Sequence, residues 1–272
     1  MKVSLTAALD AGPQAPILFR GAMAGAFGLA AELGYDGVEI HLQRPGDIDR
    51  SAVADLARRH NLGLPTLGTG MAAGREGLAF SDPDPEVRAR AVQRIRDQIE
   101  LAAFLRSGVT IGLIYSRHGG EPTQREAKRK AAVACLKECC RHAERRGVTL
   151  FLEAINRYET DLLVTLDDAA ACLREVGSGS LKLLADTFHM NIEEADLVAS
   201  LRRLNGVLGH VHLVDSNRRV PGHGHLDVAA ILGALRSIRY EGYLSFEALP
   251  LPDPASAARD GIETIRRLLN AR

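Results

Sequence analysis

The chain has no tryptophan and few other aromatic residues, and it carries no excess of charge. Aromatic residues make up 4% of its 272 residues, and the 34 lysines and arginines equal the 34 aspartates and glutamates in number. Proteins that grip single-stranded or bent nucleic acid combine basic charge with aromatic side chains on which bases stack. A balanced chain also lacks an overall field that would attract an anionic membrane. We therefore expect neither nucleic acid nor a membrane as a partner.

Long apolar runs are also missing, and cysteine is scarce. No run approaches the roughly 18 apolar residues of a membrane span, and the first residues, MKVSLTAALDAGPQ, lack a signal-peptide pattern. We therefore expect a cytoplasmic protein. No two of the four cysteines form a CxxC pair. Disulfides are rare inside cells, so we expect buried or half-buried helix residues rather than zinc ligands at Cys135, Cys139, Cys140 and Cys172.

Phosphate-binding motifs are absent as well. The turn after the first expected strand, Leu9–Pro13, does not match the glycine-rich dinucleotide fingerprint, and no GxxxxGK[ST] motif occurs. This argues against nucleotide binding of either kind.

What the chain does contain is a regular alternation of short apolar runs and longer amphipathic stretches. Expected strands are Val3–Ala8, Gly37–His41, Gly63–Leu67, Val109–Ile114, Val148–Glu153, Leu181–Ala185, Leu208–Val214 and Tyr243–Glu247. Expected helices are Ala22–Leu33, Ser51–His60, Pro85–Leu105, Gln124–Arg146, Leu166–Val176, Leu197–Asn205, Val228–Arg236 and Pro254–Leu269. The strands are continuously apolar, as parallel strands covered on both faces are. Eight such units predict an α/β fold, one (β/α)8 TIM-barrel domain spanning residues 1–272.

Four of the later strands end in side chains that can bind a metal: Glu153, Asp186, His212 and Glu247. Strand ends of a barrel converge on one pocket, and three carboxylates beside one another need a counter-charge. We therefore expect these four residues to form one metal site. Oxygen-rich ligation with one histidine and no thiolate suits Mn²⁺, Mg²⁺ or Co²⁺.

Neighbouring polar residues have plainer interpretations. His210 is expected to be a satisfied core histidine, and Glu193 and Glu194 are expected to be acids in the first turn of a helix. Asp215 would either cap the next element or orient His212. The roles of His223 and His225 stay open. The polar segments 69–85 and 116–124 follow strands three and four, so we expect loops on the catalytic face there.

These motifs resemble a known family. FLEAINRYETD, LADTFHMNIEE, HVHLVDSNRRVPGHGHLD and YLSFEALP look like the site motifs of ketose 3-epimerases related to D-tagatose 3-epimerase, within the xylose-isomerase-like barrel superfamily. ILFRG, LGTG, GLAFSDPDPEVR and VTIGL in the first half resemble the 5-keto-L-gluconate epimerase branch. The resemblance implies metal ligation by Glu153, Asp186, His212 and Glu247, and substrate binding by Glu159, His189 and Arg218. It also implies a homo-oligomer, a dimer or a tetramer.

The resemblance further implies a metal-dependent sugar 3-epimerase, with Mn²⁺ as the first choice of ion. Glu153 and Glu247 would act as base and acid on opposite faces of C3, through a cis-enediolate. The substrate class stays open between neutral ketoses and keto-uronates such as 5-keto-L-gluconate, and so does the acceptance of phosphorylated sugars. Partners for a uronate carboxylate would be Arg75, Arg117 or His118.

Two other activities use the same scaffold. An aldose–ketose isomerase has an overlapping metal site but moves hydrogen between C1 and C2. An endonuclease IV-like enzyme needs further histidines at the tips of strands three and four, which here read Gly68-Thr69-Gly70 and Gly112-Leu113-Ile114. The endonuclease is therefore the remote alternative.

Overall fold

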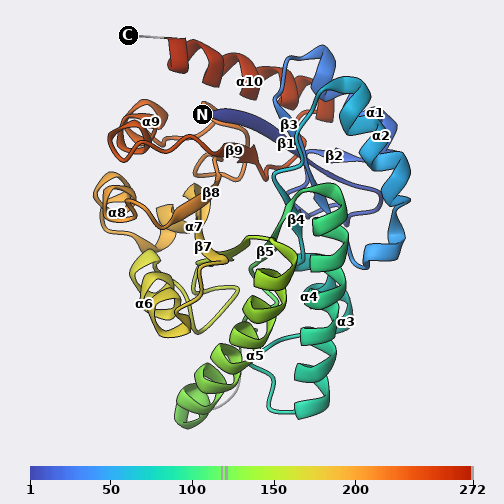
Figure 1. The fold of residues 1–272 in the computed structure, drawn as a ribbon. Coiled ribbons are helices and arrows are strands. Elements are labelled where there is room, and N and C mark those ends of the chain that lie inside the picture. The colour runs from blue at the N-terminus through green and yellow to red at the C-terminus, as the bar shows by residue number, and fades with distance from the viewer. Residues whose placement is uncertain (118, 120–121, 271–272) are drawn as a thin grey trace.

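A closed parallel barrel forms the centre of the molecule (Figure 1), seen here in a computed structural model that describes residues 1–117, 119 and 122–270. The strands follow one another around the ring in the order β1-β3-β4-β5-β6-β7-β8-β9, and β1 closes it by pairing with β9. A two-residue strand, β2, pairs with the C-terminal end of β1, at Ala7 and Ala8. The strands are β1 Lys2–Ala8, β2 Phe19–Arg20, β3 Gly37–His41, β4 Thr66–Gly68, β5 Gly108–Ile111, β6 Leu150–Glu153, β7 Leu181–Asp186, β8 Leu208–His212 and β9 Tyr243–Phe246.

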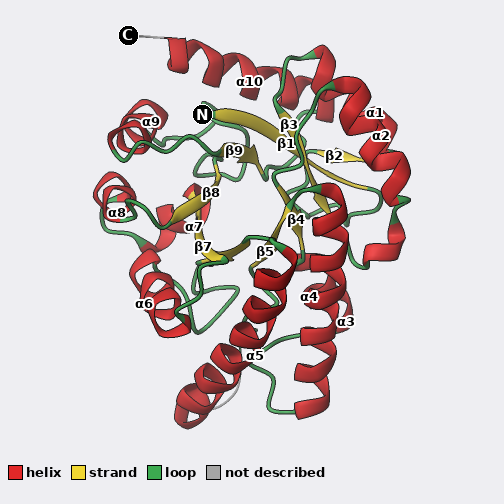
Figure 2. Cartoon of the chain, in the orientation of Figure 1, coloured by secondary structure: helices red, strands yellow, loops and turns green. Residues whose placement is uncertain are grey.

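Helices surround the ring of strands (Figure 2), which confirms the predicted (β/α)8 barrel. They are α1 Met23–Glu32, α2 Arg50–His60, α3 Gly70–Glu76, α4 Pro85–Leu105, α5 Arg125–Arg146, α6 Leu166–Val176, α7 Thr187–Glu193, α8 Leu197–Arg203, α9 Val228–Ser237 and α10 Pro254–Asn270. Short 3-10 turns lie at Pro45–Asp47 and Pro122–Gln124.

Four strand boundaries differ from the prediction by two or three residues. β6 begins at Leu150 and not at Val148, and β8 ends at His212 and not at Val214.

The third expected strand begins three residues later than predicted, at Thr66, because Pro65 has no N–H to donate to a ladder. The fourth ends at Ile111, since the carbonyl of Gly112 already accepts a turn hydrogen bond from the N–H of Tyr115. Both strands are therefore shorter than their apolar runs.

Two short helices were not expected from the sequence. Segment 69–85 was expected to be a loop, yet it contains α3, which ends at Gly77 in a left-handed conformation. The other is α7, which begins directly after β7, with Asp186 as its N-cap. Two turns give only a weak helical pattern, which sequence reasoning missed in these two segments although α8, equally short, was expected.

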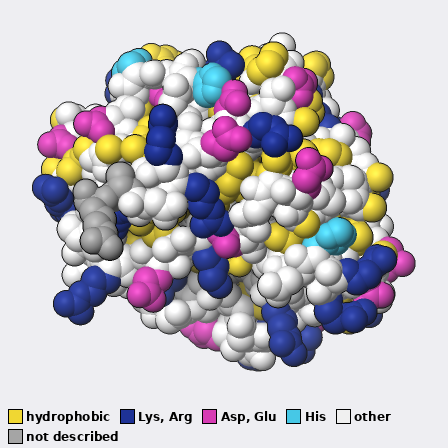
Figure 3. Space-filling model, turned by 90° about the horizontal axis from the view of Figure 1, so that it is seen from above, with side chains coloured by type: hydrophobic (Ala, Val, Ile, Leu, Met, Phe, Trp, Pro, Cys, Tyr) yellow, Lys and Arg dark blue, Asp and Glu magenta, His cyan; other side chains and the backbone are white. Residues whose placement is uncertain are grey.

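The cysteines lie where they were expected. All four are free and buried, three of them in α5 and Cys172 in α6. Among the described residues, no helix combines the length and apolarity that crossing a bilayer requires. On the face seen in Figure 3, Lys and Arg side chains are interspersed with Asp and Glu, so that face carries no field of one sign.

Candidate metal centre and cavity

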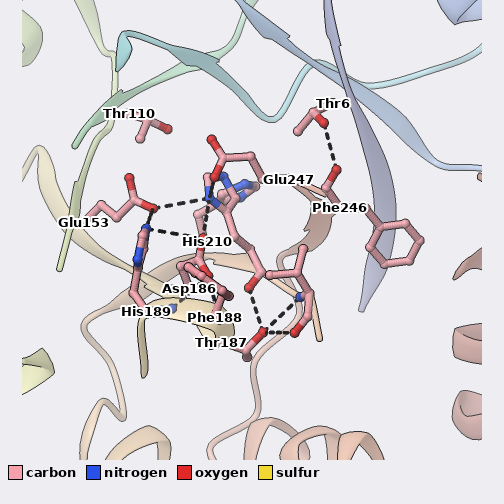
Figure 4. A network of polar contacts seen from close by, with 12 residues as sticks. Thr6, Thr110, Glu153, Asp186, Thr187, Phe188, His189, His210, Phe246 and Glu247 are labelled. Atoms are coloured by element: carbon pink, nitrogen blue, oxygen red, sulfur yellow. Dashed lines mark hydrogen bonds and ion pairs between the residues drawn. The ribbon is translucent and has the colours of Figure 1, made fainter. Parts of the chain in front are cut away.

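Four side chains from four consecutive strands meet at one point of the barrel. Glu153 ends β6, Asp186 ends β7, His212 ends β8 and Glu247 directly follows β9. One ligand atom from each lies within 4.8 Å of the others. Figure 4 shows Glu153, Asp186 and Glu247 turned toward this common point. The structure therefore brings together the four residues that the sequence proposes as ligands.

The geometry of this group fits a single divalent ion. Nδ1 of His212 lies 3.4 Å from Oε1 of Glu153, 3.6 Å from Oδ2 of Asp186 and 3.5 Å from Oε2 of Glu247. Oε1 of Glu153 and Nδ1 of His212 are buried and have no hydrogen-bond partner among the described residues. Buried polar atoms that face one another without partners are costly unless a further group satisfies them. Three oxygens and one imidazole nitrogen suit a hard or borderline cation.

Asp186 uses its two oxygens for different purposes. Oδ1 accepts hydrogen bonds from the backbone N–H groups of Phe188 and His189, which starts α7. Oδ2 faces His212 and accepts a hydrogen bond of 2.9 Å from Arg218. A strand-end acid is often a helix cap, and this residue is both a cap and a candidate ligand.

Arg218 lies beside the four candidate ligands and contacts two of them. Its guanidinium donates to Asp186 and to Oε2 of Glu247, and it lies 4.8 Å from the ring centroid of Phe188. Its backbone has φ of 61°, a left-handed conformation that a non-glycine residue seldom adopts. The contacts of the side chain hold this conformation in place.

His189 and Glu159 are joined through Asn156. The Nδ2 group of Asn156 lies 2.7 Å from Nδ1 of His189 and donates a 2.8 Å hydrogen bond to Oε1 of Glu159. Nε2 of His189 points to the ligand group, 4.0 Å from Oε1 of Glu153. Asn156, to which the sequence assigned no role, therefore fixes the positions of the His189 and Glu159 side chains.

Several corrections concern the acids near the site. Asp215 neither caps the next helix nor touches His212: its oxygens accept backbone hydrogen bonds from Ser216, Gly222 and Leu226 and so fold the loop after β8. Glu193 and Glu194 are not first-turn acids, because they lie at the end of α7.

Each of these two glutamates instead joins α7 to another segment. Glu193 forms a bidentate pair with Arg157 in the loop after β6, accepting from Nε at Oε1 and from Nη2 at Oε2. Glu194 accepts from the backbone N–H of Leu166, the first residue of α6.

Sequence reasoning missed two residues on β3. Glu39 is fully buried, and its carboxylate contacts the rings of His41, His210 and His212. His210 is buried, as expected of a core histidine, and its partner is Glu39. The available signal was the pattern GVEIH, which places a glutamate and a histidine two residues apart on one face of an apolar strand.

The electrostatics of the group favour a bound cation. Burial raises the pKa of the Glu153 and Glu247 carboxyl groups above the ordinary value. Burial acts in the same direction on Asp186, but the charges of Arg218 and His189 outweigh it and hold the pKa of Asp186 below its ordinary value. Burial thus disfavours keeping all three carboxylates ionised without a further positive charge.

A cavity of about 260 Å³ opens onto this group. Glu153, Glu159, His189, Arg218 and Glu247 all line it, together with His41, residues of the loop after β1, Thr69, and residues of α3 that include Arg75. Segment 69–85 thus contributes to the cavity, but mainly through α3 and not through a loop as predicted.

The three residues suggested for a uronate carboxylate lie in different places. Arg75 lines the cavity, and its guanidinium is paired with Asp10 at 3.2 Å. Arg117 donates to the carbonyl of Gly77 and lines another hollow. His118 lies outside the described residues.

Glycines occupy the positions where a trinuclear cluster would need further histidines. A Cβ at Gly68 would lie 2.4 Å from Nδ1 of His41, and a Cβ at Gly112 would lie 2.5 Å from Oε2 of Glu153. Any side chain at either position would displace a residue that lines the cavity. The endonuclease alternative is therefore not favoured.

Comparisons with known proteins agree with this geometry. The sequence model of the xylose isomerase-like TIM barrel family matches residues 27–268. L-ribulose 3-epimerase from Mesorhizobium japonicum is 36% identical over 222 residues, covering 80% of this chain and 72% of the relative.

Two solved structures show the same fold over nearly their whole length. D-allulose 3-epimerase from Methylomonas sp. in complex with D-allulose has a TM-score of 0.82 and 27% identity, covering 98% of this chain and 97% of that one. 3-Keto-D-glucoside 4-epimerase from E. coli has a TM-score of 0.83 and 25% identity, covering 98% of this chain and 100% of that one. These three proteins are named as epimerases of sugars, at C3 or at C4.

Proposed function

The chain belongs to the xylose isomerase-like TIM barrel family, and from that premise we propose that it is a divalent-metal-dependent epimerase inverting C3 of a free keto-sugar. It is a carbohydrate epimerase, as its curated relatives are. The observation that supports inversion at C3 is the pair Glu153 and Glu247. Their carboxylates reach the same cavity, one from β6 and the other from the end of β9.

The ligands of the ion would be Glu153, Asp186, His212 and Glu247. We expect Mn²⁺, with Mg²⁺ or Co²⁺ as alternatives. When bound, the ion would act as a Lewis acid on the negative charge that develops on the ketose oxygens.

Inversion beside a carbonyl requires the loss of a C–H proton from one face and the gain of a proton on the other. Strands β7 and β8 separate β6 from β9, so Glu153 and Glu247 approach the cavity from different sides. One carboxylate takes the C3 proton to give an enediolate, and the other, as a carboxylic acid, returns a proton to the opposite face. The roles exchange in the reverse direction.

The remaining polar side chains would hold the substrate. His189 and Arg218 flank the ligand group and would hydrogen-bond the C2 oxygen, where negative charge develops. Glu159 lies at the outer end of the Asn156 bridge and would accept a hydrogen bond from the C1 hydroxyl.

The charges of the cavity favour a neutral sugar. Both arginines that line it are already paired, Arg75 with Asp10 and Arg218 with Asp186 and Glu247. Its volume of about 260 Å³ is below the range of about 300–1,000 Å³ found for drug-sized ligands, which suits one monosaccharide. A keto-uronate such as 5-keto-L-gluconate would have to draw Arg75 away from Asp10, so we rank it second.

The test is a panel of neutral ketoses, keto-uronates and phosphorylated sugars incubated with the chain and Mn²⁺, with products identified by NMR. We expect a C3 epimer from a neutral ketose, no reaction after chelation, and turnover reduced at least about 100-fold in Glu153→Gln and in Glu247→Gln. The matched control is Glu100→Gln, because Glu100 pairs with His142 and Arg146 outside the cavity. Full activity of either site variant would refute the two-carboxylate scheme.

Other products would indicate other activities of the same site. An aldose would identify an aldose–ketose isomerase, and a C4 epimer would place the reacting carbon one position further along the sugar. Undiminished activity in chelator would refute the metal site.

A further inference from the structure

One buried carboxylate, Glu39, contacts three imidazole rings. Its Oε1 lies 2.9 Å from Nε2 of His41 and 3.0 Å from Nε2 of His212, and its Oε2 lies 2.8 Å from Nε2 of His210. Glu39 is fully buried at the middle of β3, and no atom of it belongs to the cavity lining. It therefore cannot touch a substrate, and its effect must pass through the histidines.

The contact with His212 determines which ring nitrogen carries the proton. An ionised carboxylate only accepts hydrogen bonds, so an Nε2 at 3.0 Å from it must carry hydrogen. A neutral imidazole that is protonated at Nε2 has its lone pair at Nδ1. In His212, Nδ1 is the atom that faces Glu153, Asp186 and Glu247.

We propose that Glu39 is the positioning residue of the metal centre, holding His212 as the Nε2–H tautomer so that the Nδ1 lone pair is directed at the ion. This inference rests on the proposed metal site and adds to it a residue on a strand that supplies none of its ligands. Carboxylates that accept from the outer nitrogen of a ligating histidine commonly fix its tautomer and raise its basicity.

The surroundings of Glu39 support this arrangement. The ring of His212 has both nitrogens committed, Nε2 to Glu39 and Nδ1 toward the ligand group. His210 occupies the other oxygen of Glu39, and its ring packs between Phe151 and His212 at centroid distances of 5.5 and 5.3 Å. The carboxylate is thereby held on both sides, and the ring of His212 cannot turn without breaking its hydrogen bond.

The spacing of Glu39, His210 and His212 would also admit a second ion. That arrangement requires the Nε2 atoms to be unprotonated ligands, whereas the positioning role requires Nε2–H donors. The two therefore predict opposite protonation at the same atom and different numbers of ions per chain.

The experiment compares Mn²⁺ binding by isothermal titration calorimetry in the wild-type chain, Glu39→Gln and Glu76→Gln. Glu76 is the matched control because it is also a hydrogen-bonded carboxylate, paired with Arg94 away from the ligand group. We expect one ion per wild-type chain, a Kd raised about 10–100-fold in Glu39→Gln, and a Kd within twofold of wild type in Glu76→Gln. Melting of the metal-free chains shows whether each variant folds.

A second measurement needs no variant. In wild-type chain labelled with ¹⁵N-histidine and loaded with diamagnetic Zn²⁺, we expect the ring shifts of His212 to show hydrogen on Nε2 and none on Nδ1. Hydrogen on Nδ1, two ions per chain, or an unchanged Kd in Glu39→Gln would each overturn the proposal. A wild-type chain that binds no Mn²⁺ would instead refute the metal site on which it rests.

Discussion

At Gly112 the absence of a side chain leaves room for a proposed metal ligand. An added Cβ would lie 2.5 Å from Oε2 of Glu153 and 3.3 Å from Cδ1 of Ile155. The end of the Glu153 side chain can move aside, so the fold should tolerate alanine while the carboxylate leaves its position. For Gly112→Ala we predict a Kd for Mn²⁺ raised at least about tenfold and a correspondingly lower kcat/KM, measured by calorimetry and product NMR.

The control for this substitution is Gly28→Ala in α1, where an added Cβ would meet nothing within 4 Å. Alanine there should raise the free energy of unfolding by about 0.5–1 kcal/mol, because glycine weakens a helix interior, and should leave Mn²⁺ binding unchanged. Equal Mn²⁺ affinity in Gly112→Ala and wild type would show that Glu153 does not need this space.

Residues at strand ends were the part of the candidate site that the sequence predicted. Glu153, Asp186, His212 and Glu247 follow apolar runs, and the barrel alone brings such positions together. Glu39 could not be found in this way, because it lies inside a run and two of its three histidine partners are 171 and 173 residues away. Only the folded chain shows which buried carboxylate meets which histidine.

At the scale of elements, Glu76 connects α3 by hydrogen bonds to α4 and to the loop after β3. Its carboxylate accepts from Arg94, Gln43 and Arg44. The hydrogen bond from Arg94 contributes most to lowering the pKa of Glu76 from 4.5 to about 2. A carboxyl group with a depressed pKa stabilises the fold when it is ionised, so its contribution is complete above the unfolded pKa.

We predict that Glu76→Gln lowers the free energy of unfolding by about 1 kcal/mol at pH 7, since solvent screens this partly exposed network. The deficit relative to wild type should persist down to about pH 4.5 and vanish as the pH falls toward about 2. Urea unfolding of both chains in chelator, across this pH range, measures the difference. A deficit that stayed constant across the range would mean that the charge of Glu76 does not stabilise the fold.

Element types were predictable wherever the pattern was long. Helices such as α4 and α5 show many turns of amphipathic spacing, and they lie within a residue of the expected bounds. In contrast, the start of α7 is determined by one capping aspartate, Asp186, and β4 begins only after Pro65. Local hydrogen-bonding chemistry sets such boundaries, and apolar periodicity does not record it.

At the scale of the whole molecule, the metal centre would join one half of the barrel. Its four candidate ligands lie on or directly after β6, β7, β8 and β9, and β9 closes the ring against β1. An ion that binds only the folded chain stabilises it by mass action, by about 2.7 kcal/mol at a concentration of one hundred times Kd. The whole barrel should therefore melt at a higher temperature when the site is filled.

We predict that Mn²⁺ at this concentration raises Tm by about 5 °C over the chelated chain, given about 2 °C per kcal/mol for a chain of this size. Asp186→Asn should abolish the shift, because the amide retains an oxygen that can cap α7 but loses the charge facing His212. Glu76→Gln should start from a lower Tm and keep the full shift, since its carboxylate lies in another network. Differential scanning calorimetry with and without chelator measures all three, and a full shift in Asp186→Asn would place the ion elsewhere.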